Sequence, residues 1–446
     1  MAGVGRKGLL AYHTAPSRER AACTYNNKPD NVQVNDQVIR RRSVATAWLA
    51  AGLILLLVPR AWALTDFTPY ATVGFEHNSN VFARPAGDAP FAASGNTRLG
   101  DTIERYLLGV ETWLAWDRNR LTLDAQGQRF EYNNFSELSH YEHKLDGKFD
   151  WYLNSVVDGS FTYEDLRQMQ SLADTLSDQL EVQNDRAATG TLRLHVTPRW
   201  RVDLQPKWHE LDSPLLQYPR FGLREKGGAA SLNYLGINKL TAGLRVEYTD
   251  GSYHQIVAAT KFHQTTGQLT ADYAVTGLSS FTGQLGYTRR SNALINPAEA
   301  PTGSAGIGGV VGDTSAATGT LGFRRQLSVK TTVNLSVFRE VDSYVAGANS
   351  EIGTGGDAGI TWDPDVKFSL SLHYRQTNQS IKGQLAIANF ANRSDKSHLA
   401  EFYVKYYVRK WLTLRPYVTR DQRSSNFKDA NFTTTLLGVD LTARLQ

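Results

Sequence analysis

Cysteine is almost absent from this chain of 446 residues, because Cys23 is the only one. It lies in the N-terminal part that we expect to be removed, so the remaining chain has no thiol. A disulfide framework, a cysteine-ligated metal site and a lipid-modified N-terminal cysteine are therefore excluded. A chain without cysteine suits passage through an oxidising periplasm.

Apolar runs long enough to cross a membrane as a helix are also missing. The run from Val44 to Val58 has about fifteen residues, whereas a membrane-spanning helix needs roughly twenty. Three arginines precede it, and Ala61-Trp62-Ala63 has the small-x-small form that signal peptidase cleaves. We therefore expect residues 1–63 to be an upstream extension plus a secretory signal, cleaved near Ala63. Residues 1–39 are polar and patternless, which favours a start assigned too far upstream over a long signal n-region.

The chain carries no excess charge of one sign once residues 1–63 are set aside. The whole chain has a formal charge of +5 and a pI near 9.0, which would suit a nucleic-acid partner. Residues 1–63 hold nine of the 48 Lys and Arg and three of the 43 Asp and Glu. The remainder has 39 basic and 40 acidic residues, a net charge of −1, so no nucleic-acid partner is expected.

Motifs of catalysis are missing too. The sequence has no His-Glu-x-x-His, no Gly-x-Ser-x-Gly and no phosphate-binding glycine loop. His140 and His143, which we place in a loop beside a strand, are only a weak metal hypothesis. We expect no catalytic residue, no cofactor and no metal. An outer-membrane enzyme with Ser, His and Asp supplied from separate strands remains an alternative.

A period of two in hydrophobicity runs from Phe67 to the C-terminus. In Lys367–Arg375, Phe368, Leu370, Leu372 and Tyr374 alternate with polar residues, which is the geometry of a strand with two different faces. Trp200–Lys207 and Leu240–Tyr248 repeat the pattern. No amphipathic helix of comparable length competes with it.

The order of the connections distinguishes a barrel from a soluble all-β array, which also alternates. Short turns are expected at Asp117–Asn119, Asn154–Ser155, Thr197–Arg199, Leu235–Asn238, Thr276–Ser279, Ser328–Lys330, Asp363–Asp365 and Arg409–Lys410. Between them lie long polar stretches: His77–Gly100, Leu166–Leu180, Asp212–Phe221, Ser291–Asp313 and Ser380–Ser394. This alternation is typical of bacterial outer-membrane barrels with both termini in the periplasm. The prediction is an all-β, transmembrane, antiparallel up-and-down barrel of about eighteen strands, with sixteen to twenty compatible, as a single domain over residues 64–446.

The mean hydropathy of −0.38 agrees with a barrel, in which only alternate residues face lipid. Tryptophans support the same placement. Trp116, Trp200, Trp362 and Trp411 each lie beside a predicted short turn, where such rings would meet the periplasmic membrane interface.

The positions that alternation turns inward carry both signs of charge. The predicted inward acids are Asp124, Asp146, Asp150, Asp158, Asp203, Glu247 and Asp272, and the predicted inward bases are Arg193, Arg201, Lys207, Arg245, Arg290, Arg324, Lys405 and Arg415. Opposed rows of charge would set a transverse field across an aqueous channel and bias which solutes pass. The alternative is that these residues are solvated and pair across neighbouring strands.

Aromatic residues also fall on the inward side. They are Trp113, Phe130, Tyr152, Tyr403 and Tyr407. Rings beside carboxylates and amides suit sugars, whose C–H faces pack on aromatic surfaces while their hydroxyls take hydrogen bonds. A register error of one residue would turn these rings toward lipid instead.

Two loops deserve separate expectations. Leu166–Leu180 has leucines and a methionine near helical spacing, which permits a short helix folded into the mouth, although a surface loop is favoured. Asn292–Asp313 is rich in Gly, Ala and Pro, which indicates a mobile external loop.

A family resemblance follows from the first expected strand. Tyr70–Phe82, with its Gly-aromatic step and Asn-Ser-Asn-Val-Phe segment, resembles the opening of outer-membrane β-barrel porins, and most of all EpsL-like proteins associated with exopolysaccharide biosynthesis. Gln128–Tyr132 and the Leu-Asp-Gly-Lys region at Leu145 are similar as well. His77, where an acid is expected, and the ending Ala443–Gln446, which lacks a terminal aromatic, depart from the pattern.

The resemblance implies a non-enzymatic role in exopolysaccharide production or export across the outer membrane of a Gram-negative bacterium. It implies a polysaccharide substrate, and as partners outer-membrane lipids and lipopolysaccharide, the barrel-assembly machinery and periplasmic polysaccharide-export proteins. The alternatives are a general or sugar-selective diffusion porin, a lipid- or glycan-modifying enzyme, and a purely structural barrel.

Overall fold

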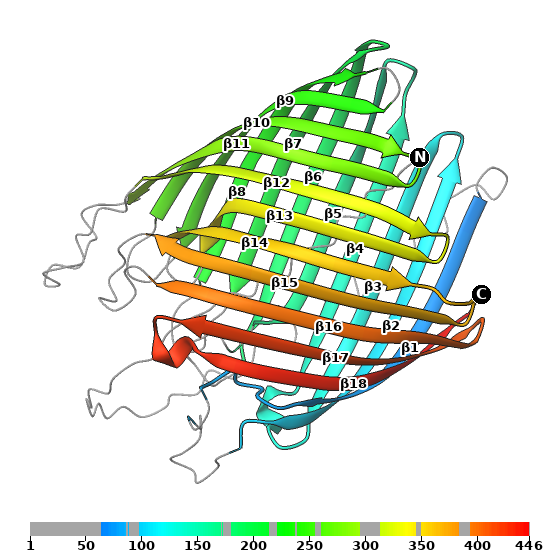
Figure 1. Cartoon of the computed structure of the whole chain (residues 1–446), viewed down its shortest axis with the longest axis vertical. Helices are drawn as coiled ribbons and strands as arrows, with labels where there is room; N and C mark the ends of the chain where they lie inside the picture. Colours follow the sequence, from blue (N-terminus) through cyan, green and yellow to red (C-terminus); the bar gives the residue numbers. More distant parts are fainter. Residues whose placement is uncertain are drawn as a thin grey trace, which may run out of the picture.

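The computed structural model describes residues 64–85, 88, 98–170, 172, 180–213, 221–236, 239–254, 260–294, 313–344, 349–382 and 393–445. In these residues one sheet of eighteen strands is present. Each strand pairs antiparallel with the next along the chain, and β1 pairs with both β2 and β18, so the sheet closes on itself (Figure 1). The prediction of an all-β up-and-down barrel of about eighteen strands is confirmed. The expected signal, with its cleavage near Ala63, lies outside the described residues.

The strands are β1 (Leu64–Asn78), β2 (Asp101–Trp116), β3 (Asn119–Tyr132), β4 (His140–Tyr152), β5 (Val157–Met169), β6 (Val182–Thr197), β7 (Trp200–Ser213), β8 (Phe221–Leu235), β9 (Leu240–His254), β10 (Thr260–Thr276), β11 (Ser279–Leu294), β12 (Thr314–Ser328), β13 (Thr331–Tyr344), β14 (Asn349–Trp362), β15 (Phe368–Lys382), β16 (Ser394–Arg409), β17 (Leu412–Ser425) and β18 (Phe432–Arg444). They are longer than the ten or so residues expected, from 13 in β4 to 17 in β10. At about 3.3 Å per residue and a tilt of roughly 40°, thirteen residues cross about 33 Å, which matches the hydrocarbon core of a membrane.

All eight predicted short turns join strands at one end of the barrel, which we call the turn end, and the C-terminus lies at the same end (Figure 1). Side chains of the turns cap the backbone. The Asn154 carboxamide oxygen accepts the N–H groups of Val156 and Val157 at 2.8 and 2.9 Å. The other connections lie at the opposite end, the loop end.

Among the described residues at the loop end are two short 3₁₀ turns, η2 (Ser136–Leu138) and η5 (Lys428–Ala430). Within the described ranges, no helix is long and apolar enough to cross a membrane.

Large apolar side chains are exposed along the outer wall, as lipid-facing residues must be. Leu108, Leu244, Leu269 and Leu437 are between 60% and 72% exposed. Near the turn end, aromatic rings of neighbouring strands pack against each other. The pairs and their centroid distances are Trp116–Phe149 at 5.6 Å, Trp200–Tyr234 at 5.2 Å, Phe281–Phe323 at 4.7 Å and Phe368–Tyr406 at 4.8 Å. Such a belt is typical of a membrane interface, so the chain has the two faces of a transmembrane barrel.

Three local expectations need correction. Leu166 and Met169 belong to β5, so a helix beginning there is wrong, while residues 173–179 lie outside the described residues. His140 and His143 lie within β4 rather than in a loop. Asn292 still belongs to β11, and most of the predicted Gly- and Ala-rich loop, residues 295–312, lies outside the described residues.

Candidate functional site

The inner face of the barrel is identified by contacts between strands that are not neighbours. Ser343 Oγ on β13 donates to Glu225 Oε1 on β8 at 3.0 Å, although β9 to β12 lie between these strands in the sheet. Only the interior offers such a path. Glu225 therefore faces inward, and strand pairing carries this assignment from β8 round the ring.

Every residue predicted to line the lumen shares the inner face with Glu225. By strand pairing, this set is Asp146, Asp150, Asp203, Glu247, Arg193, Arg201, Arg245, Arg324, Lys405 and Arg415. The alternation of the sequence thus placed these side chains on one face. Their contribution to a solute pathway remains a prediction.

Most of these charges form ion pairs along the wall itself. Arg193 lies 2.7 Å from Asp158, Lys144 lies 2.5 Å from Asp146, and Lys207 lies 2.6 Å from Glu247. Acids and bases therefore alternate within one wall instead of forming opposed rows across the lumen. Most of these charges are neutralised by a neighbour, so the field across the interior is weaker than separate rows would produce.

Inner-face glycines let side chains reach two strands away. Arg105 on β2 crosses Gly74 on β1 and lies 2.5 Å from Asp440 on β18. A Cβ at Gly74 would be 2.5 Å from the Asp440 carboxylate, so a larger residue would block this contact. Tyr417 crosses Gly438 in the same way, since a Cβ there would lie 2.5 Å from its ring.

Two histidines on the inner face are each held between two carboxylates. Both ring nitrogens of His209 lie about 3 Å from carboxylates, Nε2 at 2.9 Å from Asp185 and Nδ1 at 3.0 Å from Glu225. His373 is flanked in the same manner by Asp357 and Glu401, at 2.5 and 3.1 Å. Each ring thus lies within hydrogen-bond distance of one carboxylate on the strand before it and one on the strand after it. No cluster of three His, Cys, Asp or Glu suited to a metal ion occurs in the described residues.

The loop ends of β13 and β14 bend into the lumen. Toward the loop end, the last residues that pair between β12 and β13 are Gly319 and Arg339. Pairing between β13 and β14 continues further, to Tyr344 opposite Asn349. We call residues 340–344 and 349–352 the hairpin end. Its Ser343 reaches Glu225 and accepts from Arg290 at 2.8 Å. The hairpin end therefore lies across the inner wall and narrows the loop end.

A buried apolar cluster lies beside the hairpin end. Leu211, Leu223, Tyr253 and Phe262, from four consecutive strands, are all less than 9% exposed. Arg290 is 1% exposed; its guanidinium lies 3.4 Å from the Phe262 ring centroid and donates to the Tyr253 hydroxyl at 2.9 Å. This arrangement joins the cluster to Ser343 through one arginine.

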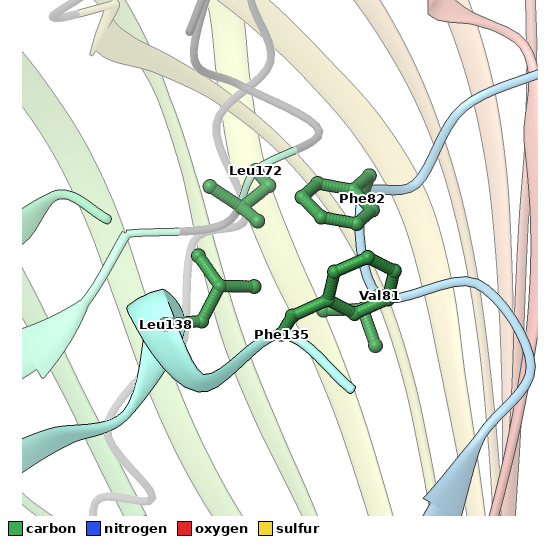
Figure 2. Close-up of a cluster of buried hydrophobic side chains, with 5 residues drawn as sticks. All are labelled: Val81, Phe82, Phe135, Leu138 and Leu172. Carbon is green, nitrogen blue, oxygen red and sulfur yellow. The ribbon is translucent and has the colours of Figure 1, made fainter. Parts of the chain in front are cut away.

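A second buried cluster lies on the β1–β5 side of the loop end. Figure 2 shows Val81, Phe82, Phe135, Leu138 and Leu172 pointing toward one another from the segments that follow β1, β3 and β5. Phe82 and Phe135 meet edge to face at 4.7 Å. Two clusters and the hairpin end thus pack the loop end, where the sequence had favoured external loops and left open one short helix folded into the mouth.

The predicted sugar-stacking residues do not form one continuous ladder. Arg120 lies 5.1 Å from the Trp113 ring, and Arg118 lies 4.5 Å from the Tyr152 ring. Phe130 stacks on His140 at 5.1 Å, near the loop end. The remaining two are on β16, where Lys405 lies 5.6 Å from Tyr403 and Tyr407 lies near the turn end. Several ring faces are therefore covered by the chain's own cations, and sugar stacking remains a prediction.

One groove of about 890 Å³ lies on the outer wall. Its lining is largely outward apolar residues of β10 to β15, among them Tyr273, Phe281, Leu321 and Val337. It belongs to the lipid-facing side and not to the interior.

Comparison with known proteins shows likeness in fold only. No family model matches the sequence, and no curated protein is significantly similar to it. The fold is similar to that of the copper transporter OprC, with 10% identity, a TM-score of 0.47, and coverage of 83% of this chain but only 63% of OprC, less than two thirds of it. It is also similar to the siderophore receptor PirA from Pseudomonas aeruginosa (10% identity, TM-score 0.43, 85% and 80% coverage). OpdK from Pseudomonas aeruginosa, solved with vanillate, has 12% identity, a TM-score of 0.42, and coverage of 85% of this chain and 99% of OpdK.

Proposed function

We propose that this protein is an outer-membrane channel through which small hydrophilic solutes diffuse. The observation that carries the proposal is the closed barrel with charged and polar side chains on its inner face and leucines and aromatic rings on its outer face. A closed barrel satisfies every backbone group within lipid. Barrels of sixteen to eighteen strands generally leave an aqueous interior unless it is filled.

Conductance in planar bilayers tests this proposal. Purified, heat-modifiable protein is expected to add stepwise, ohmic conductance to the bilayer. The control is the same preparation boiled before addition, because an unfolded barrel inserts no pore. A folded protein that adds no conductance above the boiled control over a range of voltages contradicts the proposal.

Export of an exopolysaccharide is a second candidate. The resemblance of Tyr70–Phe82 to EpsL-like proteins motivates it. The packed loop end also favours it, because a barrel narrowed by its own hairpin end suits a pathway that export partners open. Deleting the gene is then expected to lower secreted polysaccharide while its cytoplasmic precursors remain. Unchanged secretion argues against this function and leaves diffusion standing.

The expected partners are proposals, and assays on the purified protein separate the remaining alternative functions. A membrane barrel requires outer-membrane lipids, lipopolysaccharide and the assembly machinery, which remain proposals, as do periplasmic export proteins. Turnover of phospholipid, lipopolysaccharide or glycan by the purified protein would indicate an enzyme. Neither turnover nor conductance would indicate a structural barrel.

A further inference from the structure

The inner wall is uncharged over one continuous sector. On β10 to β13 the inner positions halfway along the strands include Gln268, Thr270, Gln284, Thr320 and Ser336, which we call the neutral wall. The charged inner residues of β10 to β13 lie toward the strand ends: Asp272 and Arg324 toward the turn end, and Arg290, Glu340 and Asp342 toward the loop end. Hydroxyls and amides therefore face the lumen without any charge among them.

The inner wall on the opposite side of the barrel is charged. Its inner positions halfway along β3 and β4 include Asp124, Lys144, Asp146 and Lys148, and lysine pairs with aspartate along the same strand. The interior thus has a neutral side and an ion-paired side. A solute in the barrel meets a full set of charges on one side only.

The glutamines of the two sides differ in their hydrogen bonds. On the charged side, Gln126 accepts from Tyr70 at 3.1 Å and Gln205 accepts from Arg245 at 2.6 Å. Within the described residues, Gln268 and Gln284 make no side-chain hydrogen bond. The amides of the neutral wall are therefore available to a solute.

We propose that the channel favours uncharged, polyhydroxylated solutes of the size of small saccharides, which exchange hydrogen bonds with the neutral wall as they pass. This inference rests on the proposed diffusion function. A hydroxylated solute loses water on entering a narrow pore, and neutral donors and acceptors replace that water with weak bonds from which it can leave. An ion gains no attraction from the neutral wall, and on the opposite side the lysines of β4 are already paired with aspartates.

Swelling of protein-loaded liposomes tests the inference. Entry of a neutral pentose is compared with entry of an anion and a cation of similar size, at equal osmolarity. The expected rate for the pentose is about fivefold higher than for either ion, which corresponds to roughly one weak hydrogen bond gained on the pathway. Equal rates for neutral and charged solutes overturn the inference.

Two matched variants locate the pathway. Gln284→Glu adds one charge to the neutral wall, and Thr191→Asp adds one charge to the inner face of β6. We expect Gln284→Glu to slow the pentose severalfold and Thr191→Asp to leave its rate nearly unchanged, with both variants remaining heat-modifiable on gels. Equal effects of the two variants overturn the assignment to β10–β13. If the wild-type barrel admits no solute and adds no conductance, the diffusion function itself fails, and this inference fails with it.

Discussion

The hydroxyl oxygens of Thr314 on β12 and Ser350 on β14 lie 2.7 Å apart, although β13 separates these strands in the sheet. Neighbouring strands are about 4.8 Å apart, so side chains as short as Thr and Ser meet across an intervening strand only if the sheet folds over. Ser350 is 1% exposed and Thr314 is 7% exposed. The contact therefore fixes the hairpin end against the inner wall.

Cysteines at these two positions should lock the hairpin end. We expect Thr314→Cys with Ser350→Cys to form a disulfide under a mild oxidant, because hydroxyls in contact place their Cβ atoms within disulfide reach. Cys23 lies in the expected signal, so a chain that lacks residues 1–63 would carry no other cysteine. Bilayer recordings should show steady conductance when oxidised and larger fluctuations after reduction.

Each single-cysteine variant is the control for this lock, since neither can form the bridge. Identical recordings before and after reduction of the double variant, with the disulfide verified by mass, would show that the hairpin end does not move in the open channel.

Asp440 holds two arginines at the seam where β18 meets β1. Its carboxylate lies 2.5 Å from Arg105 and 2.5 Å from Arg415, and its side chain is 3% exposed. Asp440→Asn would leave Arg105 and Arg415, whose side chains are 19% and 37% exposed, without the buried carboxylate that they share. We expect a loss of about 2 to 4 kcal/mol in the free energy of unfolding. The measurement is the temperature at which the compact, unboiled gel band disappears.

Asp146→Asn is the matched control for the seam. Asp146 and its partner Lys144 are 38% and 32% exposed, so water screens that pair. We expect a change below about 1 kcal/mol there. If Asp440→Asn and Asp146→Asn lower the melting temperature of the compact band equally, the ion pairs of Asp440 contribute no more to stability than an exposed pair does.

Glu181, just before β6, predicts a pH dependence of stability. Burial raises the pKa of its carboxyl from 4.5 to about 7, and its side chain is 3% exposed. The folded state therefore binds a proton that the unfolded state releases between these two values. Stability should be greatest below pH 4.5, fall by roughly 2 to 3 kcal/mol as the pH rises to about 7, and stay level above it.

Glu181→Gln isolates this contribution from the other titrating groups. The variant should melt with the wild type in acid and melt higher than it above pH 7, when unboiled gel bands are followed across the pH range. A constant difference between the two proteins at every pH would assign the effect to something other than ionisation.

Much of the fold could be predicted because a barrel imposes the same rule on every strand. The two-residue period of Phe368–Tyr374 requires one lipid face and one wet face, and turn residues such as Asn154 and Asp365 fix where strands end. The same rule placed Arg193 and Asp203 on the inner face. These features depend on residues that are close together in the chain, so they can be predicted from the sequence.

The hairpin end could not be predicted, because its contacts depend on where β12 and β13 separate. Ser343 and Ser350 are small polar residues that would suit any loop. The apolar cluster did leave a signal: Leu211, Leu223, Tyr253 and Phe262 occupy inner positions near loop ends, where the pattern otherwise calls for polar residues. An apolar residue on a wet face indicates something packed against it.

Phe262 is the residue through which this packing can be tested. Its ring is 1% exposed and lies under the guanidinium of Arg290, which donates to Ser343 in the hairpin end. Phe262→Ala removes the ring, leaves a cavity worth about 2 to 4 kcal/mol, and frees the arginine that holds the hairpin end. We expect larger and noisier single-channel conductance together with a lower melting temperature of the compact gel band. Phe281→Ala removes an equal ring from the outer wall near the turn end, so it should leave conductance unchanged; a rise in both variants would mean that general loosening, and not release of the hairpin end, widens the channel.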